Sequence, residues 1–600
     1  MDHAPFSPVT AASFRRAMIA GARRVIDARD ELNRINVFPV PDGDTGSNLA
    51  STLGNVLQGA LSRRSRHIGE LLVRMGNDAI DGARGNSGAI MAQFLVGLAE
   101  HARHAPELDA PSLAAAVRNG ERSARAALAE PVEGTILSVI DAFADALEEA
   151  AQVPMRDPRG GFDTALQRAR VALARTPMQM AALRRAGVVD AGARGFVDWL
   201  EGIADYLDGG PRALRMRAAP PPANEAPPPH VHEDIDPARR WCTECLVTGD
   251  GIDRDALRAA LVALECDSLV VAGSASRVRV HGHAGSPQQL FDACATFGHV
   301  DAMKADDMVL QQRSTESPGK VAVVTDSASD LPPAIGERLG IHVVPARVSL
   351  DGRDYLDRLG LTAGEFYRRM AASATLPQTS QPPAGDFRRL FDHVLAHQPA
   401  GVYVGVSRPL SGTLQSGEAA ARTQARPLRC IDSGHVSAGQ SLLAWRAGEM
   451  ADQGAGVEAI AVELERLRPL THTFAMARDI RHAARGGRIP RWVAQLMRWT
   501  GLTPVARVDA QGRLKVAGGL IARAGAPEAF ARYVGKRVPQ ASQWRLVVGH
   551  ADALADGERL VAALRGRLRV DEAHLVEVGP AVGAHAGPGT LVVGLQPSPS

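Results

Sequence analysis

Residues 36–48 read NVFPVPDGDTGSN, and this short stretch decides how the first third of the chain folds. Asp42 and Asp44 flank one glycine, and the prolines before them favour a tight turn. Two carboxylates on one turn can face the same ion, and their hard oxygens suit Mg²⁺ carrying nucleotide phosphates. Asn36 could supply a further neutral oxygen. The same residues also suit a surface turn that caps a helix through Thr45 or Ser47.

The sequence on both sides of this turn has helical spacing. Almost no segment of the first third alternates with the period of two that a half-buried strand shows. We therefore predict an all-helical domain over residues 1–212, with functional loops at the helix ends. Apolar residues recur every three or four positions in 14–26, 68–80, 88–101 and 136–150.

Three further glycine-containing turns occur in the same third of the chain. They read GARGNSG at 82–88, PVEGT at 131–135 and VDAGARG at 189–195. Backbone N–H groups of a glycine-rich loop that opens a helix bind phosphate well. Each turn taken alone is equally typical of an ordinary helix cap.

Taken in order, the four motifs resemble the nucleotide domain of dihydroxyacetone-kinase-like (DhaL) proteins, above all the branch found in fatty acid kinases. The resemblance implies an all-helical barrel whose loops hold ATP through Mg²⁺. It implies that Asp42 and Asp44 bind Mg²⁺, with Asn36 near the place of a third ligand. Ser47 and Leu49 replace the Thr and Met common in relatives, which are mild changes. The nucleotide contacts that it implies are Thr45, Asn48, Asn86, Ser87, Gly88, Gly134, Thr135 and Asp190.

A proline-rich segment, PPPANEAPPPH at 220–230, separates the helical third from the rest. It can form neither a helix nor a central strand, so we predict a stiff linker over 213–238. Residues 239–316 then carry the β-branched runs CLVTGD, SLVVAG and RVRVHGH beside a helix-like 254–264. This pattern predicts a small α+β module.

The small module contains a candidate zinc site. His281 and His283 are two residues apart on a predicted strand, so they share one face, and Cys242 and Cys245 lie upstream. Imidazole and thiolate suit Zn²⁺, although this spacing is not that of a standard finger and two histidines on a strand face are unremarkable. The module resembles the middle domain of fatty acid kinases, which implies metal ligation by Cys242, His281 and His283. Cys245, where an apolar residue is commoner, is either a fourth ligand or a buried thiol.

The C-terminal half, residues 317–600, alternates apolar runs with helix-like segments. The run that ends in TDSASD at 325–330 opens a predicted parallel sheet with crossover helices, and later runs predict a second lobe. Hydroxyl, guanidinium and imidazole groups in its loops could together hold a carboxylate, though each alone also suits a cap or a turn. No G-x-S-x-G elbow is present, which disfavours a nucleophilic serine.

In order, TDSASDL, TSQP, LSGTLQS, IDSGHVSAGQ, GGRI and AHAGPG resemble the DegV family of fatty-acid-binding proteins. The resemblance implies a two-lobed α/β fold with a tunnel for one acyl chain and a carboxylate at its mouth. Leu414 and Arg485 stand where Tyr and Lys are common. The fatty acid contacts that it implies are Thr379, Ser380, Ser411, Gly412, Thr413 and His585. The catalytic residues that it implies are Arg488, Arg523 and His585.

The composition and charge of the whole chain argue against some classes of function. The 600 residues carry 68 basic and 66 acidic side chains, a net charge of +2, with no basic run that would indicate nucleic acid. The first residues lack the pattern of a signal peptide, and no window is apolar enough to cross a bilayer. Five cysteines are an odd and sparse set, so we expect a cytoplasmic protein. Transient contact with a membrane surface stays open.

These features together predict a fatty acid kinase that transfers the γ-phosphoryl group of ATP to a fatty acid carboxylate, a step that suits phospholipid synthesis. A homodimer and a downstream acyltransferase are the expected protein partners. Two alternatives stay open. One is a glycerone-kinase-like enzyme for a small hydroxylated substrate, and the other is a non-enzymatic fatty acid carrier or regulator.

Overall fold

The computed structural model describes residues 8–38, 43–152, 158–210, 235–316, 319–478, 502–521, 525–539 and 543–598. The chain forms two compact units, 1–309 and 310–600, and each is described by itself. Asp42, Arg488, Arg523 and most of the predicted linker 213–238 lie outside the described residues.

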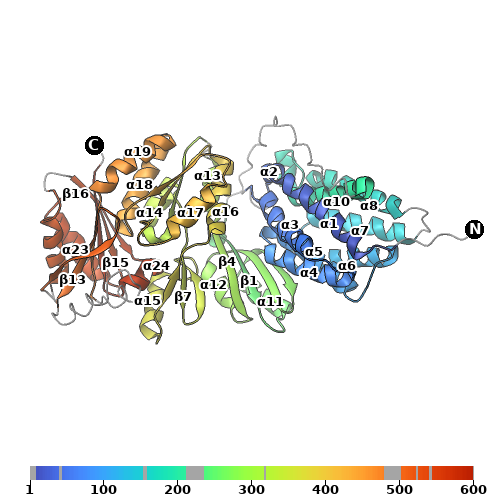
Figure 1. Ribbon diagram of the computed structural model, residues 1–600, viewed down its shortest axis with the longest axis horizontal. Helices are drawn as coiled ribbons and strands as arrows, with labels where there is room; N and C mark the ends of the chain where they lie inside the picture. Colours follow the sequence, from blue (N-terminus) through green and yellow to red (C-terminus); the bar gives the residue numbers. More distant parts are fainter. Residues whose placement is uncertain are drawn as a thin grey trace, which may run out of the picture. The chain divides into compact units, whose positions relative to one another are not determined.

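The first part of unit 1 is all helical (Figure 1). Helix α1 begins with a capping box between Thr10 and Ser13, and Asp109 caps α6 by accepting the N–H of Ser112 at 2.9 Å. Helix α5 is buried on almost every side and forms the centre of this bundle. The helices are α1 (Ala11–Asp27), α2 (Arg29–Arg34), α3 (Thr45–Ser62), α4 (Ile68–Gly82), α5 (Gly85–Ala102), α6 (Ala110–Ala126), α7 (Ile136–Gln152), α8 (Pro158–Gln179), α9 (Ala181–Ala186) and α10 (Ala191–Gly209).

The second part of unit 1 is a four-stranded antiparallel sheet in the order β2-β3-β1-β4. Buried Arg279 of β3 donates to the carbonyl oxygen of Asp81 at 2.8 Å, where a cation complements the C-terminal end of α4. The N–H of Gly273 donates to Gln93 of α5 at 2.6 Å. These bonds anchor the module on the helical bundle. Its elements are η2 (Pro237–Arg239), β1 (Trp241–Thr248), α11 (Arg254–Val262), β2 (Asp267–Ser274), β3 (Arg277–Ala284), α12 (Pro287–Cys294) and β4 (His299–Asp307).

Unit 2 begins with a parallel sheet in the order β11-β10-β5-β6, accompanied by a small antiparallel sheet, β8-β7-β9. Strands β5 and β10 are buried along their whole length, as expected for a parallel sheet covered on both faces. The elements are α13 (Met308–Glu316), β5 (Ala322–Asp326), η3 (Ser327–Ser329), α14 (Pro333–Leu339), β6 (His342–Val344), β7 (Arg347–Leu350), β8 (Arg353–Leu356), α15 (Ala363–Ala372), β9 (Gln378–Ser380), α16 (Ala384–His397), β10 (Gly401–Gly405), α17 (Thr413–Ala421), β11 (Leu428–Asp432), α18 (Ala438–Asp452), α19 (Val457–Leu467) and η4 (Arg468–Leu470).

A six-stranded mixed sheet, β14-β13-β12-β17-β15-β16, forms the second lobe of unit 2. The predicted fold class is thereby confirmed: a helical domain, a small α+β module and a two-lobed α/β domain follow one another. The elements of this lobe are β12 (His472–Met476), β13 (Thr503–Val508), β14 (Leu514–Leu520), α22 (Ala526–Gly535), β15 (Gln543–His550), α23 (Leu554–Arg565), β16 (Arg569–Glu577), α24 (Pro580–Ala586) and β17 (Leu591–Pro597).

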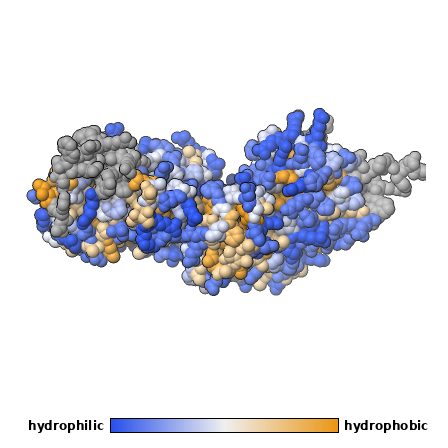
Figure 2. Space-filling view, turned by 90° about the horizontal axis from the view of Figure 1, so that it is seen from below, coloured by the Kyte–Doolittle hydropathy of each residue, from blue (hydrophilic) through white to orange (hydrophobic). Residues whose placement is uncertain are grey.

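The helical domain has a polar exterior on the face seen from below, where hydrophilic side chains predominate and apolar ones are scattered (Figure 2). Scattered apolar side chains are normal on a protein surface. Among the described helices, none combines the length and the apolar character needed to span a bilayer.

Candidate functional site

The glycine-containing turns of unit 1 all lead into helix starts that meet. Asp44 occupies the N-cap position of α3, and Gly85 is the first residue of α5. Asp190 caps α10 by accepting the N–H of Ala193 at 2.7 Å, and its carboxylate also accepts the backbone N–H of Ile136 at the start of α7. Helix N-termini gathered in this way favour an anionic ligand.

Two glycines are required where these helices approach each other. Gly85 has φ +56°, and a Cβ atom there would lie 2.3 Å from Nδ2 of Asn48. A Cβ atom at Gly88 would lie 2.5 Å from Oγ1 of Thr52. A side chain at either position would push α5 away from α3 and open the loop between them.

The starts of α3 and α5, together with residues of β1 and β3, surround a small cavity of about 40 Å³. Oδ1 of Asp44 accepts a hydrogen bond from Asn48 at 2.7 Å, and the hydroxyl of Thr45 donates to Oδ1 of Asn36. The buried amide oxygen of Asn86 has no hydrogen-bond partner in the part of the chain that the structure describes. This oxygen-rich lining fits Mg²⁺. The predicted residues that line the cavity are Asn36, Asp44, Thr45, Asn48, Asn86, Ser87, Cys242, His281 and His283.

The electrostatics of the cavity are set by burial and by one lysine. Burial raises the pKa of Asp44 from its ordinary value, and the ammonium of Lys304 and the hydrogen bond from Asn48 oppose that rise. Burial likewise raises the pKa of Asp190 to about 6. Gly134, Thr135 and Asp190 do not line the cavity, and they shape the turns before α7 and α10.

Three side chains of the small module form a group that could hold a metal ion. Cys242 of β1 pairs directly with His283 of β3, and His281 lies on the same face two residues earlier. One ligand atom from each lies within 4.8 Å of the other two, and all three side chains are buried. Burial raises the pKa of the Cys242 thiol, and the Lys304 ammonium counteracts part of this effect.

A carboxylate lies beside each histidine of this group, and the one beside His281 is hydrogen-bonded to it. Nδ1 of His281 lies 3.1 Å from Oε1 of Glu244, and Nδ1 of His283 lies 3.1 Å from Oδ1 of Asp267. Both Nε2 atoms are thereby left for an ion, the arrangement typical of histidine ligands of zinc. The residues therefore fit Zn²⁺. Glu244 and Asp267 were not predicted from the sequence; for Glu244 the available signal was its spacing of two from Cys242 on a strand.

Cys245 does not belong to this group. Side chains alternate along β1, so Cys245 lies on the face opposite to Cys242. There it is buried beside Cys294 of α12, with a hydrogen bond between the two side chains. Of the two alternatives for Cys245, the buried thiol is the one that the structure supports.

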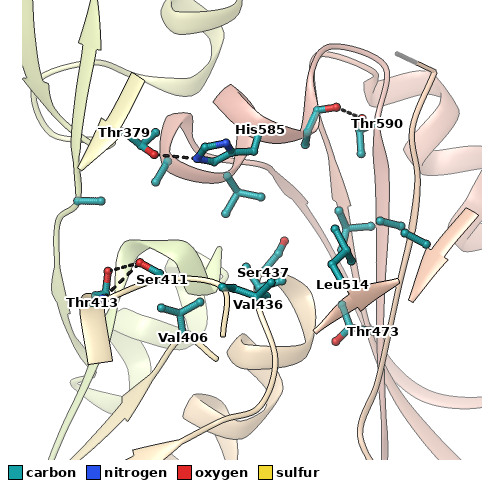
Figure 3. A pocket seen from close by; sticks show the side chains of 18 of the residues that line it. Thr379, Val406, Ser411, Thr413, Val436, Ser437, Thr473, Leu514, His585 and Thr590 are labelled. Carbon is teal, nitrogen blue, oxygen red and sulfur yellow. Dashed lines mark hydrogen bonds between the residues drawn. The ribbon is translucent and has the colours of Figure 1, made fainter. Parts of the chain in front are cut away.

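Unit 2 contains a cavity of about 470 Å³ with a mainly apolar wall, a size typical of ligand pockets. It lies between the two lobes, and alanine, valine and leucine side chains of β13, β14 and α24 form much of the wall. Figure 3 shows Leu514 of β14 in this wall, with Val406 and Val436 from the loops after β10 and β11. An apolar cavity of this kind suits a hydrocarbon chain.

Two pairs of polar groups lie at the edge of this cavity (Figure 3). Oγ1 of Thr379 lies 2.8 Å from Nε2 of His585, and the hydroxyls of Ser411 and Thr413 lie 2.8 Å apart. Ser411 and Gly412 precede the N-terminus of α17, which favours an anion. A Cβ atom at Gly412 would lie 1.9 Å from Oε1 of Gln381, so a side chain there would displace the Gln381 amide. The predicted fatty acid contacts Thr379, Ser380, Ser411, Gly412, Thr413 and His585 all line the cavity.

A buried histidine supports the wall of this cavity from behind. Nε2 of His435 lies 3.0 Å from the carbonyl oxygen of Arg468, so this nitrogen carries the hydrogen of the neutral ring. Nδ1 then accepts from the hydroxyl of Thr473, a lining residue, at 2.9 Å. Burial lowers the pKa of His435 to about 4.

This histidine predicts how stability depends on pH. The folded pKa of about 4 lies below the ordinary histidine value of 6.5, so the unfolded chain binds the proton more readily between these values. Stability is therefore present above pH 6.5 and is lost as the pH falls toward 4, by about 3 kcal/mol. Urea unfolding at pH 7, 6, 5 and 4 should show this loss in the native protein and not in His435→Gln. Equal pH dependence of the two proteins would contradict it.

Three family models match successive parts of the chain. Residues 39–205 match the DAK2 domain, and residues 238–315 match the FakA-like middle domain of fatty acid kinase. Residues 320–598 match the DegV family.

Curated relatives cover only part of this arrangement. An uncharacterized protein of Staphylococcus haemolyticus is 30% identical over 319 residues, which are 51% of this chain and 56% of that protein. An uncharacterized protein of Staphylococcus aureus strain USA300 is 30% identical over 321 residues, 51% of this chain and 57% of its own length. The chain thus spans about half the length of the curated relatives that it matches.

Solved structures resemble the C-terminal part. One is a DegV family protein from Thermus thermophilus that is described by its fatty acid binding, and it is 32% identical. The match covers 46% of this chain and 100% of that chain, with a TM-score of 0.43. A Thermotoga maritima protein described as having a fatty acid binding function is 25% identical, with 46% and 99% covered and a TM-score of 0.43. From the family models, the chain joins a DAK2 domain, a FakA-like middle domain of the fatty acid kinase type and a DegV-family domain in one polypeptide.

Proposed function

We propose that this chain is a fatty acid kinase, which transfers the γ-phosphoryl group of ATP to the carboxylate of a fatty acid bound in the cavity of unit 2. The main support for the proposal is this cavity, which has an apolar wall and hydroxyl and imidazole groups at its edge. The same chain also has the glycine loops of unit 1. The match of residues 238–315 to a fatty acid kinase middle domain supports the same activity.

The acceptor would be held by groups suited to an anion. Ser411 and Thr413 offer hydroxyl hydrogens at the start of α17, where the helix dipole also favours a carboxylate. Thr379 of β9 offers another hydroxyl group beside His585. His585 completes the cluster and would contact the head group. The apolar wall would take the acyl chain, which favours a fatty acid over a small hydroxylated substrate.

The chemistry needs positioning more than proton transfer. A carboxylate is already ionised at neutral pH, so one of its oxygens attacks the γ-phosphorus without a general base. The bond from the γ-phosphorus to the bridging oxygen breaks, and ADP leaves with the electron pair. The product is an acyl phosphate, an activated acyl donor, so an acyltransferase is the class of enzyme that would consume it. The homodimer, Arg488 and Arg523 stay predictions.

The metal site for this reaction would be the loop at the start of α3. Asp44 would hold Mg²⁺, and Asn36 lies close by in the same cavity. Asp42, the other predicted ligand, lies outside the described residues. When bound, Mg²⁺ neutralises charge on the nucleotide phosphates. The loop N–H groups at the starts of α5 and α10 would orient the phosphates.

The test is to trap the product. Purified protein would be incubated with ATP, Mg²⁺ and a long-chain fatty acid, and acyl phosphate would be converted to a hydroxamate with hydroxylamine. We expect hydroxamate that depends on all three components. ADP formation that responds to dihydroxyacetone and not to fatty acid would favour the small-substrate kinase, and lipid binding without any hydroxamate would leave a carrier.

We further propose that the group of Cys242, His281 and His283 binds Zn²⁺. Cys242→Ser should lower zinc affinity by about a hundredfold, because a hydroxyl is a far poorer ligand than a thiolate. Zinc retained after dialysis would be measured by elemental analysis. Cys430→Ser, in unit 2, is the matched control and should keep its zinc. Equal zinc content in the two variants would contradict this site.

A further inference from the structure

One buried carboxylate joins the two candidate sites of unit 1. Oε1 of Glu244 accepts the N–H of Gly85, at the start of α5, at 2.8 Å. The same oxygen lies 3.1 Å from Nδ1 of His281 and 3.4 Å from Nζ of Lys304. Glu244 is only 1% exposed, so all of these contacts are shielded from water. A single atom therefore touches a predicted zinc ligand and the backbone of the predicted phosphate loop.

Only one of the two oxygens of Glu244 makes these contacts. The other oxygen, Oε2, is buried and has no hydrogen-bond partner among the residues that the structure describes. The hydrogen bonds that orient this side chain are therefore those of Oε1.

We propose that Glu244 is a positioning residue that couples occupancy of the Cys242, His281 and His283 group to nucleotide binding at the glycine loop. An ion on Nε2 of His281 fixes the hydrogen on Nδ1, which then donates to Glu244. The carboxylate so held accepts the N–H of Gly85, the residue whose positive φ sets the loop. Without the ion the ring gains a second tautomer and more freedom, and the loop loses this support.

The chain supplies a matched control for this coupling. Asp267 lies beside His283, with 3.1 Å between Oδ1 and Nδ1, although this contact lacks the hydrogen-bond geometry of the pair of Glu244 and His281. Its other oxygen accepts from Arg239 at 3.1 Å, within the small module. Asp267 thus supports a ligand of the metal group and is hydrogen-bonded to no residue of the glycine loop. Removing either carboxylate should weaken metal binding, but only Glu244 should affect the coupling.

The experiment measures ADP affinity by calorimetry on the full chain in excess Mg²⁺, with zinc loaded and after a zinc-selective chelator. In the native protein we expect zinc to tighten ADP binding about tenfold. In Glu244→Ala, zinc should tighten ADP binding by less than about twofold. In Asp267→Ala at saturating zinc, the tightening of ADP binding by zinc should stay at about tenfold. Zinc itself should bind to this variant roughly 10 to 100 times more weakly than to the native protein. By linkage, ADP should tighten zinc binding to the native protein by the same factor.

A second measurement needs no variant. Hydrogen exchange of the native amides in 85–88 should slow when zinc is added, because the loop opens less often. The coupling rests on the proposed nucleotide and zinc sites and not on the fatty acid step. Zinc and ADP that bind with no mutual effect, or a tenfold effect that survives in Glu244→Ala, would overturn the coupling alone. If the native protein fails to bind zinc or fails to bind ADP, the coupling is overturned together with the proposed site for that ligand.

Discussion

Asp44→Asn should lower the rate of acyl phosphate formation on the order of a thousandfold, the largest effect that we expect from one substitution. Asp44 lies in the cavity at the helix starts, and its Oδ1 accepts from Asn48 at 2.7 Å. Asparagine keeps the shape and this acceptor but removes the negative charge that a hard cation requires. The measurement is fatty-acid-dependent hydroxamate formation at saturating ATP and Mg²⁺.

A matched variant separates this effect from loss of folding. Asp198 is also a buried carboxylate of unit 1, lies on α10 and accepts from Arg194 at 3.1 Å. It does not line the cavity. Asp198→Asn should therefore keep nearly all activity, with a modest loss of stability at most. Similar activity of the two variants, whether both low or both high, would contradict the role given to Asp44.

Ala506→Phe should weaken binding of a long-chain fatty acid by roughly a hundredfold. Ala506 of β13 lines the apolar wall, so a phenyl ring there would occupy space that the acyl chain needs. Each methylene kept out of an apolar site costs about 0.8 kcal/mol, so excluding about four of them costs about 3 kcal/mol. Affinity would be measured by displacement of a fluorescent fatty acid.

Chain length and a surface variant provide the controls for this prediction. Octanoate should be affected much less than a long-chain acid, because a short chain can avoid the blocked part of the wall. Val462→Phe introduces the same ring at a position that is 67% exposed, and it should leave binding unchanged. Equal loss for short and long acids would show that the ring disturbs the head-group cluster instead, and would refute the proposed path of the acyl chain.

Much of the fold follows from local pattern. The helical spacing of the first third, the β-branched runs of the module and the alternation in the C-terminal half all depend on neighbours within a few residues. The glycine loops were predictable as local motifs, and Gly85 adopts the positive φ that favours glycine. Sequence could not predict the role of Glu244, because its partner Gly85 lies 159 positions away along the chain.

The sequence by itself thus determined the order of the domains, the glycine loops and the identity of the groups able to hold an anion or a metal. Only the tertiary structure decided which of these groups share a site. It placed Cys242, His281 and His283 in the wall of the same cavity as Asp44, and it turned Cys245 to the other face of its strand. The physical reason is that strand register and helix packing are set by contacts between distant segments, which no local pattern specifies.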